Sequence, residues 1–477
     1  MRRSALWQTL IIKLTLWSLI IFSFNVFIPR NQVLLIYDSK RLVVCLLIML
    51  FAVGLLCSAR LRQSVIALYR SLEQPTRTFA LGFIALSLIA TLLSDYRISA
   101  LTHWFYLVGL FLLLSVFFDY FRVARANLMG LALLLNGLLF FSVASAFWLL
   151  LYHREAVSNS TFFGFANPRF INQVHVWLVL PMAYLAVRAR RRNRRALLPL
   201  ISVAMAFSIG FTLNGRGVTL ALIAGFILMA LVDRALWRQW LATLLITGGL
   251  GALISFALFN PLPSYLLGID SDAVAIRTTS SGRLILWSQS IEFASFWGQG
   301  GGAFACQPFA NGRPHNSVLN VLVHWGWGGV LCYVSLCLLL LYKVAISRSR
   351  ITQVLGASVL TGLLYSLVSG VLDSPMSQLL AILSLAAFWA SLNPLRRSDM
   401  GSYRVGLFSH GLVSHGLVSH VVVWMLALGA IMACGYRIYE RVSHYPQQFD
   451  EIVDVRALGM KTQFWVGHNC LEKPEMP

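Results

Sequence analysis

Three short polar motifs stand out in a chain that is otherwise mostly apolar. They are Asn214-Gly-Arg-Gly217, Gly282-Arg283 with Trp287 four residues later, and Arg313-Pro-His-Asn316. Arginine presents a planar fork of donors that matches phosphate oxygens, and histidine can take up a proton near neutral pH. Two arginines and a histidine therefore suit a reaction in which a diphosphate leaves and a hydroxyl is activated.

Each motif also has a purely structural interpretation. Arg216 can extend its charge to the membrane interface. Arg283 and Trp287 share one face of a helix, which can be an ordinary amphipathic surface. His315 can be a helix cap, and Asn316 can orient a polar partner beside it. A functional interpretation is favoured because all three motifs are expected on the same side of a membrane.

Hydrophobic helices must position these motifs. The 477 residues are 58% hydrophobic and 12% charged, whereas soluble domains have about 25% charged residues. Apolar runs of roughly 17–25 residues, long enough to cross a bilayer, recur along the chain. The sequence predicts an all-α polytopic integral membrane protein with about 12–13 transmembrane helices. The predicted spans are 9–28, 42–58, 78–93, 101–118, 128–151, 172–187, 197–213, 217–232, 241–259, 318–342, 353–372, 375–391 and 408–433.

The positive charges orient these spans. The net charge of +21 comes mainly from short arginine clusters between apolar runs, above all the run 188–195. Such clusters are typical of loops retained in the cytoplasm, so the charge does not indicate a nucleic-acid partner. This orientation puts the N-terminus inside, as a retained first span, and the three motifs outside.

Two outer segments are longer than connectors need to be. The first is the loop 260–317, which contains a glycine run at 298–302 and a predicted helix from Ser281 to about Ser295. The second is the C-terminal tail 434–477, whose aromatic and charged residues suit a small docking element for an acceptor. Cys306 and Cys470 both fall on the outer side, but the sequence does not establish whether they are adjacent.

The motifs together resemble a known family. Gly282-Arg283, Trp287, the glycine run, His315-Asn316 and Gly326-Trp-Gly-Gly329, with Arg216 earlier, are similar to the O-antigen ligase and polymerase superfamily. That family includes lipopolysaccharide O-antigen ligases and the O-oligosaccharyltransferases that glycosylate pilin. The segment Asn167-Pro-Arg-Phe-Ile-Asn-Gln173 resembles a further motif of ligase-like members.

The resemblance implies a metal-independent glycosyltransferase of the bacterial inner membrane with its active site facing the periplasm. The donor would be a glycan on undecaprenyl diphosphate, and the acceptor a pilin-type protein or lipid A-core. Arg216 and Arg283 would bind the diphosphate, with Arg169 as a further contact, and His315 would activate the acceptor hydroxyl. Asn316 and Trp287, beside His315 and Arg283, would also contact substrate. Neither a metal nor another cofactor is implied.

The implied organisation is a transmembrane catalytic domain over 1–433, with a ligase-like core at 164–342, followed by the periplasmic tail. Two alternatives remain open. An O-antigen polymerase would use a second lipid-linked glycan as acceptor. A polyprenyl-glycan transporter or flippase would move the donor without chemistry, but such proteins commonly show repeated spans and charges at mid-bilayer depth, and neither pattern is evident in this sequence.

Overall fold

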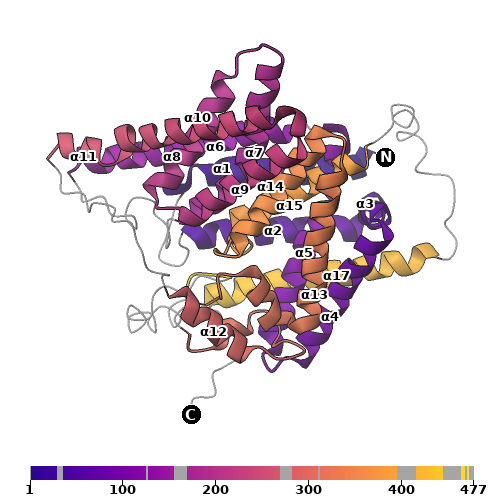
Figure 1. The fold of residues 1–477 in the computed structure, drawn as a ribbon. Coiled ribbons are helices and arrows are strands. Elements are labelled where there is room, and N and C mark those ends of the chain that lie inside the picture. Colours follow the sequence, from indigo (N-terminus) through magenta and orange to yellow (C-terminus); the bar gives the residue numbers. More distant parts are fainter. Residues whose placement is uncertain are drawn as a thin grey trace.

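The structure is a computed structural model that describes residues 2–28, 36–124, 127–154, 169–268, 282–309, 312–394, 415–443, 464–467 and 470–471. Its long helices pack side by side in a bundle with no β-sheet among the described residues (Figure 1). The helices that follow the predicted spans are α1 (Arg2–Ser23), α2 (Ile36–Cys57), α4 (Gln74–Leu93), α5 (Arg97–Ala124), α6 (Asn127–Tyr152), α7 (Arg169–Arg191), α8 (Leu197–Thr212), α9 (Arg216–Val232), α10 (Trp237–Ile254), α13 (Ser317–Ile346), α14 (Arg350–Ser366), α15 (Pro375–Leu392) and α17 (His415–Ser443).

Every predicted span overlaps one of these helices. Ten helices in the described part of the chain are long and apolar enough to cross a membrane, and α8 and α9 are shorter apolar helices. Large apolar side chains are exposed on the helix surfaces, for example Leu245 at 74% and Leu220 at 67%. In water such surfaces would be costly, but in a bilayer they face lipid. The chain is therefore an all-α, multi-pass membrane protein.

Shorter elements lie outside the predicted spans. Helix α3 (Ala59–Ser71) was not predicted, because its apolar face is too narrow to resemble a span; its Ser64 hydroxyl donates to Asp119 of α5 at 2.6 Å. Helix α11 (Leu262–Leu266) follows α10. Helix α12 (Arg283–Phe293) confirms the helix predicted in the outer loop.

The bundle has two ends, which we name for what they carry. The motif side is the end where α7, α9 and α13 begin and α17 ends. The arginine side is the end where α7 and α13 end and α8 and α14 begin. In Figure 1 the motif side lies to the left, with α11 and α12, and the arginine side to the right, with α3 and the N-terminus. The three sequence motifs therefore share one side.

Part of the C-terminal tail packs into the core, at residues 464–467. A role of the tail as a docking element for an acceptor stays a prediction. Helix α17 runs to Ser443, beyond the predicted boundary at 433. Phe464, Trp465 and Val466 are 6%, 3% and 0% exposed. The Phe464 carbonyl accepts a hydrogen bond from Arg41 Nε at 3.0 Å, and the Val466 carbonyl accepts one from Arg441 Nη1 at 2.9 Å. The tail thus supplies the acceptors that two buried arginines need.

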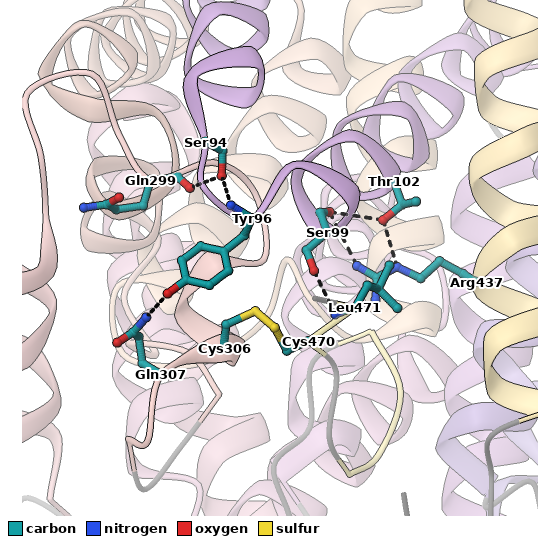
Figure 2. Close-up of a disulfide and its surroundings, with 10 residues drawn as sticks. All are labelled: Ser94, Tyr96, Ser99, Thr102, Gln299, Cys306, Gln307, Arg437, Cys470 and Leu471. Carbon is teal, nitrogen blue, oxygen red and sulfur yellow. Dashed lines mark hydrogen bonds between the residues drawn. A yellow bond between two sulfur atoms is a disulfide. The ribbon is translucent and has the colours of Figure 1, made fainter. Parts of the chain in front are cut away.

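A disulfide joins the tail to the outer loop. Cys306 and Cys470 are bonded, with their Cα atoms 4.8 Å apart (Figure 2). Around it, the Leu471 amide donates to Ser99 Oγ at 3.0 Å, and Gln307 Nε2 donates to Tyr96 Oη at 2.8 Å. The loop, the tail and the turn between α4 and α5 are therefore fastened together on the motif side.

Candidate functional site

The glycine run of the outer loop is an anchor on α13. Helix α13 is interrupted at Gly326, whose φ of 67° and ψ of −170° are not helical. The carbonyls of Val323 and His324, released by this break, accept hydrogen bonds from the amides of Gln299 at 2.7 Å and Gly300 at 3.0 Å. A Cβ on Gly298 would lie 2.5 Å from the His324 carbonyl oxygen, so only glycine permits this approach. The run positions the loop and, by this geometry, serves packing.

His315 is held in an unusual backbone conformation. Its φ is +55°, a region that residues other than glycine seldom adopt and that often marks functional sites. On its C-terminal side, Asn316 caps α13 by accepting from the amides of Val318 at 2.9 Å and Leu319 at 3.2 Å. On its N-terminal side, the Pro314 carbonyl accepts from Trp287 Nε1 at 3.2 Å. The backbone of the half-buried His315 is therefore held by hydrogen bonds at the residues on both sides of it.

These contacts involve two residues that the sequence predicted at the site. Asn316 and Trp287 were expected to contact substrate. Both use side-chain polar atoms in the local structure, Asn316 as the helix cap and Trp287 as the donor to Pro314. These hydrogen bonds help to fix the segment around His315, and contact of either residue with substrate stays a prediction.

Arg283 is the first residue of α12 and follows Gly282, which has a φ of +73°. The Arg283 side chain is half-buried, and its Nε is buried without a hydrogen-bond partner among the described residues. A buried donor left unsatisfied costs free energy, about 1–3 kcal/mol and more for a charged group. Because Trp287 lies one turn along α12 and bonds Pro314, this guanidinium belongs to the same neighbourhood as His315.

An ion pair that the sequence analysis did not identify lies beside His315. Arg313 is 4% exposed, and its Nη1 is 3.1 Å from Asp373 Oδ2. The guanidinium packs on Gly370, where a Cβ would lie 2.9 Å from Arg313 Cζ. Asp373 lies between α14 and α15, sixty residues after Arg313 in sequence, so no local pattern could reveal this pairing.

The turn over residues 367–374 connects the rest of the site. Gln173 of α7 donates to Ser369 Oγ at 3.1 Å. The Asp373 carbonyl accepts from Tyr37 Oη at 3.2 Å and from the buried guanidinium of Arg41. Helices α2 and α7 and the segment before α13 therefore meet at this turn, which we call the 367–374 turn.

Arg216 approaches the same turn from α9. It is the first residue of α9 and is exposed, with no side-chain hydrogen bond among the described residues. A Cβ on the next residue, Gly217, would lie 2.9 Å from Tyr365 and 3.1 Å from Val368. Gly217 thus lets α9 begin against the end of α14, which brings Arg216 near the 367–374 turn.

Helix α7 adds buried polar groups beside Arg216. Arg169 is the first residue of α7, but its side chain lies outside the described part of the structure. Asn172, one turn later, is fully buried, and neither of its side-chain polar atoms has a hydrogen-bond partner among the described residues. A Cβ on Gly215 would lie 2.5 Å from Asn172 Nδ2. Asn172 was quoted in the family motif but was not predicted as a site residue.

The motif side thus carries His315 together with Arg216, Arg283 and Arg313, each at or just before the start of a helix, and α7 begins there with Arg169. A scan against protein-family models and a search of proteins of curated function found no match to this sequence.

Proposed function

We propose that this protein transfers a glycan from undecaprenyl diphosphate to an acceptor hydroxyl at the motif side, as an O-oligosaccharyltransferase or O-antigen ligase. The observation that carries the proposal is Arg283 Nε, a buried donor with no partner among the described residues, next to the segment that fixes His315. A diphosphate oxygen would satisfy that donor, and the exposed Arg216 offers a second cation.

The chemistry follows from these side chains. The acceptor hydroxyl oxygen attacks the anomeric carbon of the glycan, and the bond from that carbon to the diphosphate oxygen breaks. The electron pair leaves on the diphosphate, whose added charge Arg216 and Arg283 stabilise. The hydroxyl proton passes to an imidazole nitrogen of His315. In this mechanism Arg313 is a positioning residue, because its positive charge is paired with the carboxylate of Asp373.

The membrane setting suits a lipid-linked donor. The cationic residues lie near helix ends on one side of the bundle, where we expect the head group of a membrane lipid. The polyprenyl chain would remain along the apolar helix surfaces. The same arrangement would serve an O-antigen polymerase, whose acceptor is a second lipid-linked glycan.

The proposal is tested with the purified full-length protein in liposomes that contain undecaprenyl-diphosphate-linked glycan. Three acceptors are offered separately: a pilin-type protein, lipid A-core and additional donor. We expect equal amounts of undecaprenyl diphosphate and extended acceptor in one of the three reactions. Movement of intact donor across the bilayer without release of undecaprenyl diphosphate would instead identify a transporter.

A further inference from the structure

A second polar feature lies at the opposite end of the bundle, away from the motif side. A hollow of about 490 Å³ opens there between the turn that joins α7 to α8 and the turn that joins α13 to α14. The residues that line it come from these two turns and the helix ends beside them: Tyr184, Arg188, Arg191, Arg192, Arg348, Ser349, Arg350 and Ile351. We call it the arginine hollow.

The charge of the arginine hollow is poorly compensated. Arg350 Nε pairs with Asp233 at 3.0 Å. The other four guanidiniums, those of Arg188, Arg191, Arg192 and Arg348, have no ion-pair or hydrogen-bond partner in the part of the chain that the structure describes. Like charges repel when they converge, so an anion of several charges would relieve this arrangement.

Retention of loops in the cytoplasm explains only part of the pattern. The positive-inside preference and the partial negative charge at the end of α7 account for arginines after α7. Neither requires Arg348, which lies after α13, to face the same hollow as Arg191 and Arg192. The run 188–195 also contains Arg194 and Arg195, which do not line the hollow. The fold therefore selects some arginines of the run and adds others from a distant turn.

The surroundings indicate a ligand with an apolar part. Tyr184 and Ile351 contribute apolar surface to the hollow itself. On the last turns of α13, just before Arg348, Tyr342 and Ile346 are 59% and 58% exposed. At the start of α8, just after the arginine run, Leu197 and Leu198 are 66% and 67% exposed. Surfaces that face lipid tails therefore flank the hollow on both of its turns.

We propose that the arginine hollow binds the head group of an anionic phospholipid, with Arg188, Arg191, Arg192 and Arg348 around its phosphate oxygens and the acyl chains along the exposed ends of α13 and α8. Arginine suits this role because its planar fork forms paired hydrogen bonds with phosphate. Basic pockets between transmembrane helices are known sites for such head groups. This inference is independent of the proposed transfer reaction on the motif side.

The test uses the sequence of the run itself as a matched control. The variant Arg191→Gln/Arg192→Gln removes two charges from the hollow, and Arg194→Gln/Arg195→Gln removes two charges from the same run outside it. A third variant, Arg348→Gln, removes one charge from the second turn. Each full-length protein is placed in phosphatidylcholine nanodiscs that contain increasing fractions of cardiolipin, and bound cardiolipin is measured by native mass spectrometry.

We expect roughly a tenfold or greater loss of cardiolipin affinity for the Arg191/Arg192 variant and roughly fivefold for Arg348→Gln, since one basic residue near an anionic head group contributes about a factor of five. The Arg194/Arg195 variant should bind within about twofold of the unaltered protein. Equal losses in both double variants would mean a general charge effect and would overturn the proposal, as would no loss in either.

A competition arm separates a lipid from a soluble phosphate compound. Inorganic diphosphate is added to the unaltered protein in the same nanodiscs. We expect cardiolipin to remain bound at diphosphate concentrations that greatly exceed those of the lipid, because diphosphate cannot use the flanking apolar surfaces. Displacement of cardiolipin at comparable concentrations would show a site for soluble polyanions and would overturn the assignment to a phospholipid.

Discussion

The indole of Trp287 donates a hydrogen bond to the carbonyl oxygen of Pro314 at 3.2 Å, and this contact joins helix α12 to the residue before His315. It connects two motifs that are separate in sequence, the one that carries Arg283 and the one that carries His315. The same bond therefore influences the position of both a proposed diphosphate ligand and the proposed base.

Replacement of Trp287 by phenylalanine should lower transfer several-fold while the protein still inserts in the membrane. Phenylalanine keeps an aromatic ring but removes the donor, and a hydrogen bond of this kind contributes about 1 kcal/mol. Transfer is measured in liposomes at matched protein amounts. Trp297→Phe is the control, because Trp297 is 53% exposed. Equal activity of the two variants would remove the Trp287 bond from the account.

Lysine should replace Arg283 poorly. It has a single charged group where a diphosphate would be gripped by a planar fork, and loss of one donor to a developing anion costs about 10²-fold or more in rate. Arg283→Lys should therefore transfer glycan about a hundredfold more slowly. The matched control is Arg97→Lys, an exposed arginine that also begins a helix on the motif side. If both variants lose little activity, Arg283 has only a surface role.

Asp373→Asn should destabilise the protein, because it leaves the guanidinium of Arg313 without its carboxylate in a buried position. Breaking a buried pair by removing one partner costs about 3 kcal/mol or more. The expected readout is a lower temperature of thermal unfolding in detergent. The control is Asp95→Asn, at an exposed carboxylate that forms no ion pair with the described residues, so the cost should be below about 1 kcal/mol. A similar effect of both changes would contradict the importance assigned to the Arg313–Asp373 pair.

The disulfide should hold the tail to the body of the protein after the chain is cut. A protease site inserted within residues 450–460 allows cleavage between α17 and the buried tail residues. On a denaturing gel without reductant, the two fragments should migrate as one species, and reductant should separate them. Cys470→Ser should give separate fragments in both cases. Separation of the unaltered fragments without reductant would show that Cys306 and Cys470 are not bonded.

Sequence alone predicted the parts of this fold that depend on one segment at a time. A membrane span is recognised from the length of its own apolar run, and each of the predicted spans corresponds to a helix. Helix α12 was likewise predicted from the residues of its own segment. The Arg313–Asp373 pair, the break of α13 at Gly326 and the burial of Phe464–Val466 were not predicted. Each depends on a partner far away in the chain, and no local sequence pattern indicates such a partner.

For the candidate site the same distinction holds. Arg216, Arg283 and His315 were recognised by residue type and neighbours, and the structure places all three on the motif side. The 367–374 turn, which contacts Arg313 beside His315 and Gly217 beside Arg216, consists of common residues with no site signature apart from Asp373. Asn316 and Trp287 were predicted as ligands because they accompany His315 and Arg283. The hydrogen bonds that they make to local backbone groups were not predicted, and their contact with substrate stays a prediction.

The most direct test of the proposed mechanism is Asn in place of His315. Asparagine tolerates a positive φ better than most residues, so His315→Asn should preserve the backbone at +55° while it removes the group that accepts the proton. The control is His153→Asn, an exposed histidine at the end of α6 on the motif side. Glycan attached to acceptor is measured in cells at matched membrane levels, and donor binding is measured on the purified proteins. We predict a fall in transfer of about 10²–10⁴-fold for His315→Asn, with donor binding retained and His153→Asn unaffected. Transfer by His315→Asn at the rate of the unaltered protein would contradict the assignment of His315 as the base.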